Sequence, residues 1–279
     1  NKEINSDDKE VVSNNENKEV TDNSEEVESN IVDNTNYLEL KDDINADDAV
    51  MVAENTKGLL NGTKQYPVRT DGKKVVYLTF DDGPWGARTL WVHDELIKRQ
   101  IPATFMIWGE HMADYPEIMK AAVENDLFTF GNHTYSHPHL TDLSEEEVLS
   151  EIKRTDDLFY RLTGMTFDFV RPPFGDCDAH TLSLINRPII CWSLDTMSWD
   201  HVDPAKCFEA IHNAKDGDIV LMHDFQEADV FALSAILDYL QEEEFTFKSI
   251  PELLGTQLND EAYIYYSRDK RKKVGFKGI

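Results

Sequence analysis

From Lys73 onward, short apolar runs alternate with amphipathic segments along the chain. Near-continuous apolar runs of four to eight residues, such as Ile219-Val220-Leu221-Met222, are typical of strands that are buried on both faces of a sheet. Runs of this kind predict seven strands, at 75–80, 103–108, 127–131, 167–170, 189–194, 219–223 and 245–247.

The segments between these runs carry helix signals. Apolar residues of 89–99 fall on one side of a helix, and Ser144 with Glu147 forms a capping-box pattern that begins a helix. Gly164 is expected to end that helix. Further helices are predicted at 117–125, after Asp203-Pro204, and at 228–241. The alternation predicts a parallel sheet with helices outside it, in the α/β class.

A barrel and an open doubly wound sheet share this alternation. Candidate chemical residues follow at least five of the predicted strands, which favours a barrel, because its strand ends converge on one rim. No glycine-rich phosphate loop follows the first predicted strand, which argues against a nucleotide-binding sheet.

The first 57 residues differ from the rest, with 17 Asp and Glu against 5 Lys and Arg. Such a segment buries too little apolar surface to offset the entropy of ordering, so we predict a disordered acidic arm. The predicted organisation is therefore an arm at 1–57, a lead-in segment at 58–72, a folded domain at 73–256 and a C-terminal tail at 257–279.

The formal net charge is -27, of which about -15 belongs to residues 58–279. Nucleic acid is not expected as a partner, because affinity for phosphates comes from clustered Lys and Arg. No apolar run of about 18 residues exists, so no membrane-spanning segment is predicted. The three cysteines form neither a CxxC pair nor a disulfide framework. A polar arm before a folded domain fits an extracellular or cell-surface location.

Two neighbouring carboxylates and three histidines suggest the chemistry. Asp81 and Asp82 follow the first predicted strand, and adjacent strand residues point to opposite sides, so different tasks are expected of them. A helical turn would place His133 and His137 on one face. One carboxylate and two histidines can hold a divalent metal, while the other carboxylate and His223 can move protons. The remaining histidines are expected at the surface or at helix caps, among them His93, His111, His139 and His212.

Five motifs occur in an order that resembles a known family. They are Thr79–Pro84 (TFDDGP), His133–His137 (HTYSH), Arg171–Gly175 (RPPFG), Trp192–Trp199 (WSLDTMSW) and Leu221–Asp224 (LMHD). This series is similar to that of polysaccharide deacetylases with a NodB homology domain, carbohydrate esterase family 4, over about 75–254. The resemblance implies a distorted (β/α) barrel of about seven parallel strands, with a groove across one rim. It also implies one divalent metal ion, Zn²⁺ or else Co²⁺ or another divalent ion.

The resemblance also implies roles by position. The metal ligands would be Asp82, His133 and His137. Asp81 would be the general base, oriented by Arg171, and His223 the general acid. A backbone N–H near Phe174 would help to hold the oxyanion of the tetrahedral intermediate, because Pro172 and Pro173 have no N–H.

Phe174, Trp199 and Leu221 are the candidates for the walls of the sugar groove, since flat aromatic faces suit sugar rings and a small apolar pocket suits an acetyl methyl. For Leu221, ordinary core packing is an equal alternative, and Trp192 is expected in the core.

The fourth motif departs from the family pattern, because Ser198 stands where an aspartate is common. A serine cannot stabilise an imidazolium by charge, so a lowered pKa is expected for His223 unless Asp195 or Asp200 compensates.

The sequence therefore predicts a metal-dependent hydrolase that removes N-acetyl groups from the amino sugars of a polysaccharide, either peptidoglycan or a chitin-like glycan. Two alternatives stay open. One is an O-acetyl esterase on an acetylated polysaccharide, with the same site and a different leaving group. The other is a catalytically weakened glycan-binding protein on the same scaffold, for which Ser198 is the main support.

Overall fold

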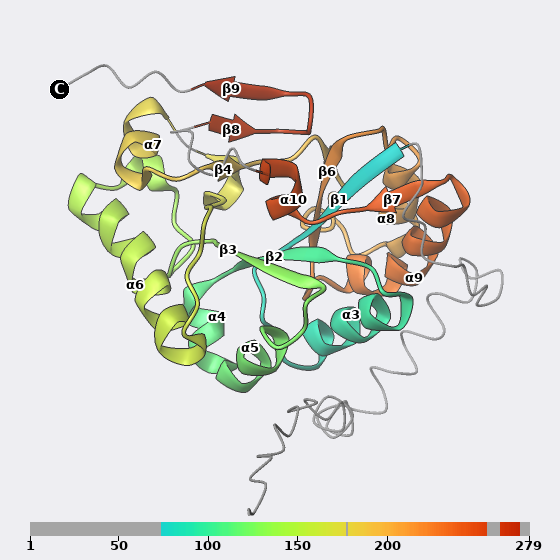
Figure 1. Cartoon of the computed structure of the whole chain (residues 1–279), viewed down its shortest axis with the longest axis horizontal. Coiled ribbons are helices and arrows are strands. Elements are labelled where there is room, and N and C mark those ends of the chain that lie inside the picture. Colours follow the sequence, from blue (N-terminus) through green and yellow to red (C-terminus); the bar gives the residue numbers. More distant parts are fainter. Residues whose placement is uncertain (1–73, 177, 256–262, 274–279) are drawn as a thin grey trace, which may run out of the picture. The chain divides into compact units, whose positions relative to one another are not determined.

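A computed structural model of the chain describes residues 74–176, 178–255 and 263–273. The predicted arm at 1–57 and the lead-in at 58–72 lie outside the described residues. The core of the described part is a parallel sheet in the order β3-β2-β1-β6-β5 (Figure 1). Its strands are β1 (Lys74–Asp81), β2 (Ala103–Ile107), β3 (Phe128–Asn132), β5 (Leu194–Asp195) and β6 (Asp218–His223).

β1 is the central strand and carries the buried side chains Val76, Leu78 and Phe80. It pairs with β2 on one side and with β6 on the other, while β7 (Phe245–Phe247) pairs with its first residues. The register sets Asp81 beside His223 of β6. Since all these strands are parallel, their carboxyl ends meet at one edge, where the polar residues of the motifs gather.

The sheet curves onward from β3 through Val170, which bridges Asn132 on one side and Ile189 on the other. Ile189 begins β4 (Ile189–Ile190), and β4 pairs with β8 (Tyr263–Tyr265), which pairs with β9 (Arg271–Lys273). The parallel strands and the surrounding helices therefore form a distorted α/β barrel, as predicted. β8 and β9 lie within the segment predicted as a tail.

Two strand predictions were wrong in extent. Within the described chain, 167–170 contributes Val170 alone to β pairing, because Phe167 and Phe169 are buried by packing and not by a ladder. The predicted strand at 189–194 is two short strands, β4 and β5. It divides because Cys191 N–H donates to Tyr265 O of β8, whereas Ser193 N–H donates to Ile219 O of β6.

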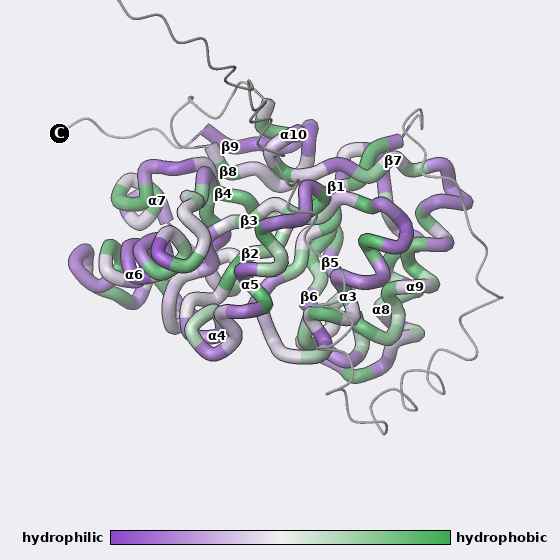
Figure 2. Tube along the Cα trace, turned by 60° about the horizontal axis from the view of Figure 1, so that its bottom comes forward, coloured by the Kyte–Doolittle hydropathy of each residue, from purple (hydrophilic) through white to green (hydrophobic). Residues whose placement is uncertain are grey.

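Helices surround the sheet (Figure 1). The longest are α3 (Gly86–Arg99), α6 (Glu145–Thr163) and α9 (Glu227–Glu242), and the shorter ones are α4 (Gly109–Asp114), α5 (Pro116–Ala122), α7 (Ala179–Ile185), α8 (Pro204–Ile211) and α10 (Ile250–Leu254). Figure 2 shows largely hydrophobic α8 and α9 and hydrophilic stretches along α6. Among the described residues, none of these helices is both long and apolar enough to cross a membrane.

The start and end of α6 confirm the capping prediction. Ser144 is the N-cap, its side chain accepts from Glu147 N–H, and the Glu147 carboxylate accepts from Ser144 N–H at 2.8 Å. Gly164 ends the helix in the left-handed region, at φ 74°. α4, α7 and α10 were not predicted, because helices of five to seven residues carry little periodicity. The equally short α5 was predicted because Pro116 marks its start.

Candidate active site

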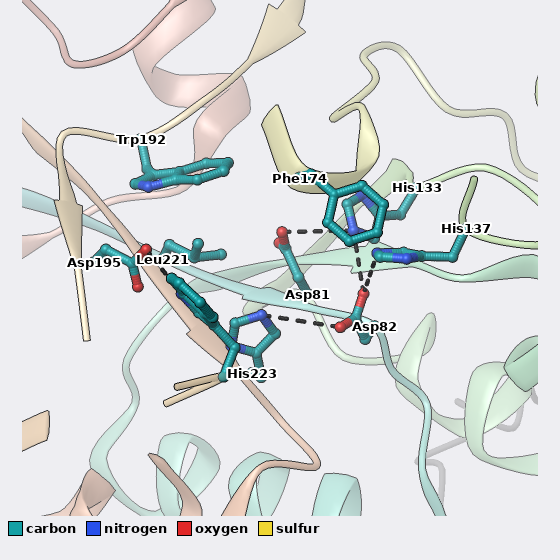
Figure 3. A pocket seen from close by; sticks show the side chains of 10 residues that line it. Asp81, Asp82, His133, His137, Phe174, Trp192, Asp195, Leu221 and His223 are labelled. Carbon is teal, nitrogen blue, oxygen red and sulfur yellow. Dashed lines mark hydrogen bonds and ion pairs between the residues drawn. The ribbon is translucent and has the colours of Figure 1, made fainter. Parts of the chain in front are cut away.

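A pocket of about 300 Å³ lies at the carboxyl edge of the sheet (Figure 3). Its residues come from the ends of β1 and β6, from the loop after β3, from the turn η2 (Pro173–Gly175), and from β5 and its flanking segments. They are Asp81, Asp82, His133, His137, Phe174, Trp192, Asp195, Trp199, Leu221 and His223. Eight of the nine residues predicted for the site line this pocket, and Arg171 lies behind Asp81.

Asp81 and Asp82 both face the pocket, although they are neighbours in the chain. Asp81 is the last residue of β1, and Asp82 has a φ of 74°, so the strand alternation that would separate their side chains has ended. The next residue, Gly83, has no room for a side chain, because a Cβ there would lie 2.1 Å from Asp224 Oδ2. Glycine is therefore required at this turn.

Asp82, His133 and His137 converge on one point. Asp82 Oδ1 lies 3.2 Å from His133 Nε2 and 3.1 Å from His137 Nε2, and one candidate ligand atom of each residue lies within 4.8 Å of the others. Within the described chain, the buried Asp82 Oδ1 has no hydrogen-bond partner. Three ligand atoms of these types that converge so closely fit a divalent cation.

The hydrogen bond of His133 supports the same interpretation. His133 Nδ1 lies 2.7 Å from Arg171 O, and because a carbonyl can only accept, Nδ1 carries the proton. The neutral ring then presents the lone pair of Nε2 to the cation position, the arrangement that metal-binding histidines use. Burial alone would lower the pKa of His133, but the Asp81 and Asp82 charges outweigh it and raise that pKa. The site favours positive charge.

The loop that carries the two histidines is not a helical turn, so that prediction was wrong. Thr134 and His137 have φ values of 68° and 59°, both left-handed. The Glu151 carboxylate of α6 accepts from Tyr135 N–H at 2.9 Å and from Ser136 N–H at 2.8 Å. A side chain thus replaces the carbonyls that a helical turn would supply, and the loop stays irregular.

Arg171 lies behind Asp81 and hydrogen-bonds to its carboxylate. Its side chain is fully buried, and its Nη1 donates to Asp81 Oδ1 at 2.6 Å and to Thr79 Oγ1 at 2.9 Å. Its Nε and Nη2 donate to backbone carbonyls, those of Ile190 and Cys191. The carboxylate of Asp81 is therefore fixed through Oδ1, and Oδ2 lies 3.7 Å from His133 Nε2.

His223 has a charged partner that the sequence did not reveal. Ser198 Oγ lies 2.9 Å from His223 Nδ1, and Asp229 Oδ2 of α9 lies 3.6 Å from the same nitrogen. Burial lowers the pKa of His223, but the carboxylates of Asp229 and Asp82 outweigh it and raise that pKa to about 9. The expected lowering was therefore wrong.

The carboxylate that compensates for Ser198 is that of Asp229, and not that of Asp195 or Asp200 as the sequence suggested. Asp195 accepts hydrogen bonds from Met197 N–H and Trp199 Nε1. Asp200 is exposed.

Aromatic side chains form the pocket walls. Phe174 and Trp199 are 56% and 57% exposed, so their faces are open to a ligand. Leu221 is buried and also lines the pocket, so it both packs in the core and forms part of the pocket wall. Trp192, expected in the core, packs against two core clusters and lines the pocket as well.

Sequence reasoning missed the residues that support the site from behind. Asp229 and Glu151 are buried acids on otherwise apolar helix faces, and this misplaced polarity was the available signal. His93 and His111 are also buried, so their assignment to the surface or to caps was wrong. His212 is exposed and lies near a helix end, as expected, with Nδ1 3.0 Å from Phe208 O.

Comparison with known proteins agrees with the motifs. The profile of the family described as "Polysaccharide deacetylase" matches residues 68–187. The peptidoglycan-N-acetylglucosamine deacetylase PgdA of Listeria monocytogenes is 33% identical over 199 residues, which are 71% of this chain and 42% of PgdA. The chain thus spans less than half of that relative. The peptidoglycan-N-acetylglucosamine deacetylase of Bacillus cereus is 33% identical over 66% of this chain and 70% of its own length.

A solved structure, of T48 deacetylase with substrate, superposes with a TM-score of 0.64. It is 34% identical in sequence, and the match covers 69% of this chain and 96% of that one.

Proposed function

The chain belongs to the polysaccharide deacetylase family, carbohydrate esterase family 4, and from this premise we propose that it is a metal-dependent N-deacetylase. Its substrate would be the N-acetylated amino sugars of a polysaccharide, and the products would be acetate and a free amine on the sugar. One observation carries the proposal: the buried Asp82 Oδ1 and two imidazole nitrogens converge beside a second carboxylate held by a buried arginine.

Asp82, His133 and His137 would hold the divalent ion, Zn²⁺ or Co²⁺ being the leading candidates. Such an ion supplies Lewis acidity, which polarises an acetyl carbonyl and lowers the pKa of water. A cation also balances the charge of two carboxylates that share one buried pocket.

Asp81 would act as the general base. Arg171 holds its Oδ1, so one oxygen is fixed and the other remains to take a proton from the attacking water. As the water adds to the carbonyl carbon, negative charge develops on the carbonyl oxygen. Gly175 N–H already donates to Pro172 O, and Pro172 and Pro173 have no N–H, which leaves Phe174 N–H as the backbone donor for that oxygen.

His223, on the strand next to Asp81, would act as the general acid. Expulsion of an amide nitrogen as an anion is strongly unfavourable, so the nitrogen must gain a proton as its bond to carbon breaks. The raised pKa keeps His223 protonated at neutral pH and able to give that proton. The register of β1 and β6, which sets Asp81 beside His223, would place base and acid on the same acetamido group.

We propose peptidoglycan as the substrate polymer. The two relatives from Listeria and Bacillus are named as deacetylases of this polymer, and the exposed Phe174 and Trp199 provide flat apolar faces for sugar rings beside the pocket. An enzyme that acts on peptidoglycan meets it outside the cytoplasmic membrane, so the proposed location is extracellular or at the cell surface.

Acetate release measured side by side on peptidoglycan, an N-acetylated chitooligosaccharide and acetylated xylan tests the proposal. We expect acetate together with new free amines from the first two substrates. Acetate from xylan alone, with new hydroxyls and no amines, would instead indicate an O-acetyl esterase. Glycan binding without acetate release under added Zn²⁺ or Co²⁺ would indicate a binding protein.

A further inference from the structure

The turn between β2 and α4 contacts both segments that carry the proposed metal ligands. We call residues Ile107–His111 the β2–α4 corner. Trp108 N–H donates to Gly83 O at 3.1 Å, next to Asp82, and Ile107 O accepts from His133 N–H at 3.0 Å. On the side of the histidine loop, the N–H groups of the corner's next two residues donate to Thr134 O and Tyr135 O at 2.9 Å. The corner therefore fixes the two segments relative to each other.

His111 is the side chain of this corner that hydrogen-bonds to a proposed ligand residue. It is 8% exposed, and its Nδ1 lies 2.6 Å from the backbone carbonyl oxygen of Asp82. Its ring lies between two tryptophan rings, with centroids 4.0 Å from Trp108 and 4.5 Å from Trp85. Trp108 in turn stacks on His137 at 4.7 Å. The histidine is thus held rigidly, and a carbonyl can only accept, so His111 Nδ1 is the donor.

The hydrogen bond from His111 holds an unusual backbone conformation at Asp82. Asp82 has a φ of 74°, a left-handed conformation that a residue with a side chain adopts only where its surroundings hold it. The direction of its Cα–Cβ bond, and hence of its carboxylate, depends on that conformation. A hydrogen bond that fixes the Asp82 carbonyl therefore fixes where Asp82 Oδ1 lies relative to the two imidazoles.

We propose that His111 is a positioning residue for the metal site, which acts through its hydrogen bond to the Asp82 carbonyl and not as a ligand. This inference rests on the proposed function, in that Asp82 is taken to bind the cation. It extends the site beyond the five sequence motifs, to the β2–α4 corner.

Two substitutions distinguish the contribution of the His111 hydrogen bond from that of its ring. His111→Phe keeps a ring between the two tryptophans and removes the donor. His111→Asn removes the ring and keeps an N–H, because asparagine Nδ2 occupies nearly the position of histidine Nδ1. His212→Phe is a matched control, since His212 also has Nδ1 near a backbone carbonyl, but at an exposed position on α8.

The measurement is the dissociation constant for Zn²⁺ and Co²⁺, together with the visible absorption spectrum of the Co²⁺ form. Loss of a partner that orients a ligand typically weakens metal binding 10- to 100-fold, and we expect a loss in this range for His111→Phe, with an altered Co²⁺ spectrum. His111→Asn should recover most of the affinity, and His212→Phe should bind like the wild type. Wild-type affinity in His111→Phe, or an equal loss in both His111 variants, would overturn the proposal.

Nitrogen NMR of the unsubstituted protein supplies a test that does not depend on variants folding. We expect a protonated, slowly exchanging Nδ1 on His111, in the metal-free protein as well. An unprotonated Nδ1 would overturn the positioning role. If the wild type binds no metal while Nδ1 is protonated, the proposed metal site fails and the hydrogen bond stands, so the two failures are distinguishable.

Discussion

At the scale of single residues, the site depends on a carboxylate that does not line the pocket, that of Asp229. Asp229 is fully buried in α9, accepts from His223 N–H at 2.7 Å, and lies 3.6 Å from His223 Nδ1. A serine at position 198 is therefore no sign of a weakened acid, since the charge comes from Asp229 on α9. A cation held by Asp82 would offset the contribution of that carboxylate, which leaves Asp229 as the main support of the imidazolium.

We predict that Asp229→Asn moves the alkaline limb of the pH–rate profile to lower pH. His223 gives its proton only in its acid form, so the rate should fall as the pH rises through the raised pKa of His223. Without the Asp229 charge the pKa of His223 drops, so the limb should shift down by about one pH unit or more. Asp200→Asn is the matched control and should leave the limb in place. An unmoved limb in Asp229→Asn would exclude the assignment.

The residues in the motifs could be predicted from the sequence, whereas their supports could not. Asp82, His133 and His137 stand in local patterns that follow strand ends, and the same edge of a parallel sheet collects such patterns. Asp229, Glu151 and His111 contact residues of other elements, at separations of 6, 15–16 and 29 residues, so no helix or strand period connects them to their partners. A charged residue on an otherwise apolar helix face is the one local signal in the sequence. It indicates that the charge is buried, but it does not identify the residue that the charge contacts.

At the scale of elements, α6 serves the site by holding the histidine loop. Its Glu151 accepts from two loop N–H groups and from Ser136 Oγ at 2.8 Å, and its neighbours on the same helix face pack into the core. The capping box at Ser144 fixes where the helix begins, and hence where Glu151 stands.

We predict that Glu151→Ala lowers the free energy of unfolding by about 1–3 kcal/mol, because it leaves two part-buried N–H groups of the histidine loop without their acceptor. Metal affinity should fall with it, since His137 belongs to the released loop. Asp157→Ala, on the same helix, removes a surface ion pair with Lys153 and should cost less than about 1 kcal/mol. Denaturant unfolding and metal titration of both variants check this. Equal stability and equal metal affinity in the two variants would show that the loop does not need Glu151.

The strands made of continuous apolar runs were predictable, whereas the two-residue strands were not. No end of β1, β2, β3, β6 or β7 lies more than one residue from its predicted bound, because continuous apolar runs report burial on both faces. β4 and β5 have two residues each, and their pairing is decided by distant strands. The run at 167–170 shows that an apolar run can be buried while only one of its residues pairs.

At the scale of the whole molecule, the proposed metal ligands belong to segments about fifty residues apart that meet only when the sheet has formed. Asp82 follows β1, whereas His133 and His137 follow β3, with β2 between the two strands. A cation that binds the folded chain and not the unfolded one must stabilise the fold, by about 2.7 kcal/mol at a concentration 100 times its dissociation constant. Chelation should therefore lower the melting temperature of the wild type, while Asp82→Ala should melt at the same temperature with or without metal.

The most direct measurement is the acetate released from peptidoglycan by metal-stripped protein as Zn²⁺ is added back. The wild type should regain its activity in proportion to Zn²⁺ and reach a plateau at one ion per chain, while Asp82→Ala, at the same concentrations, should stay inactive and bind no ion tightly. Full activity in the metal-stripped wild type, or a one-ion plateau in Asp82→Ala equal to that of the wild type, would contradict a metal site built from Asp82, His133 and His137.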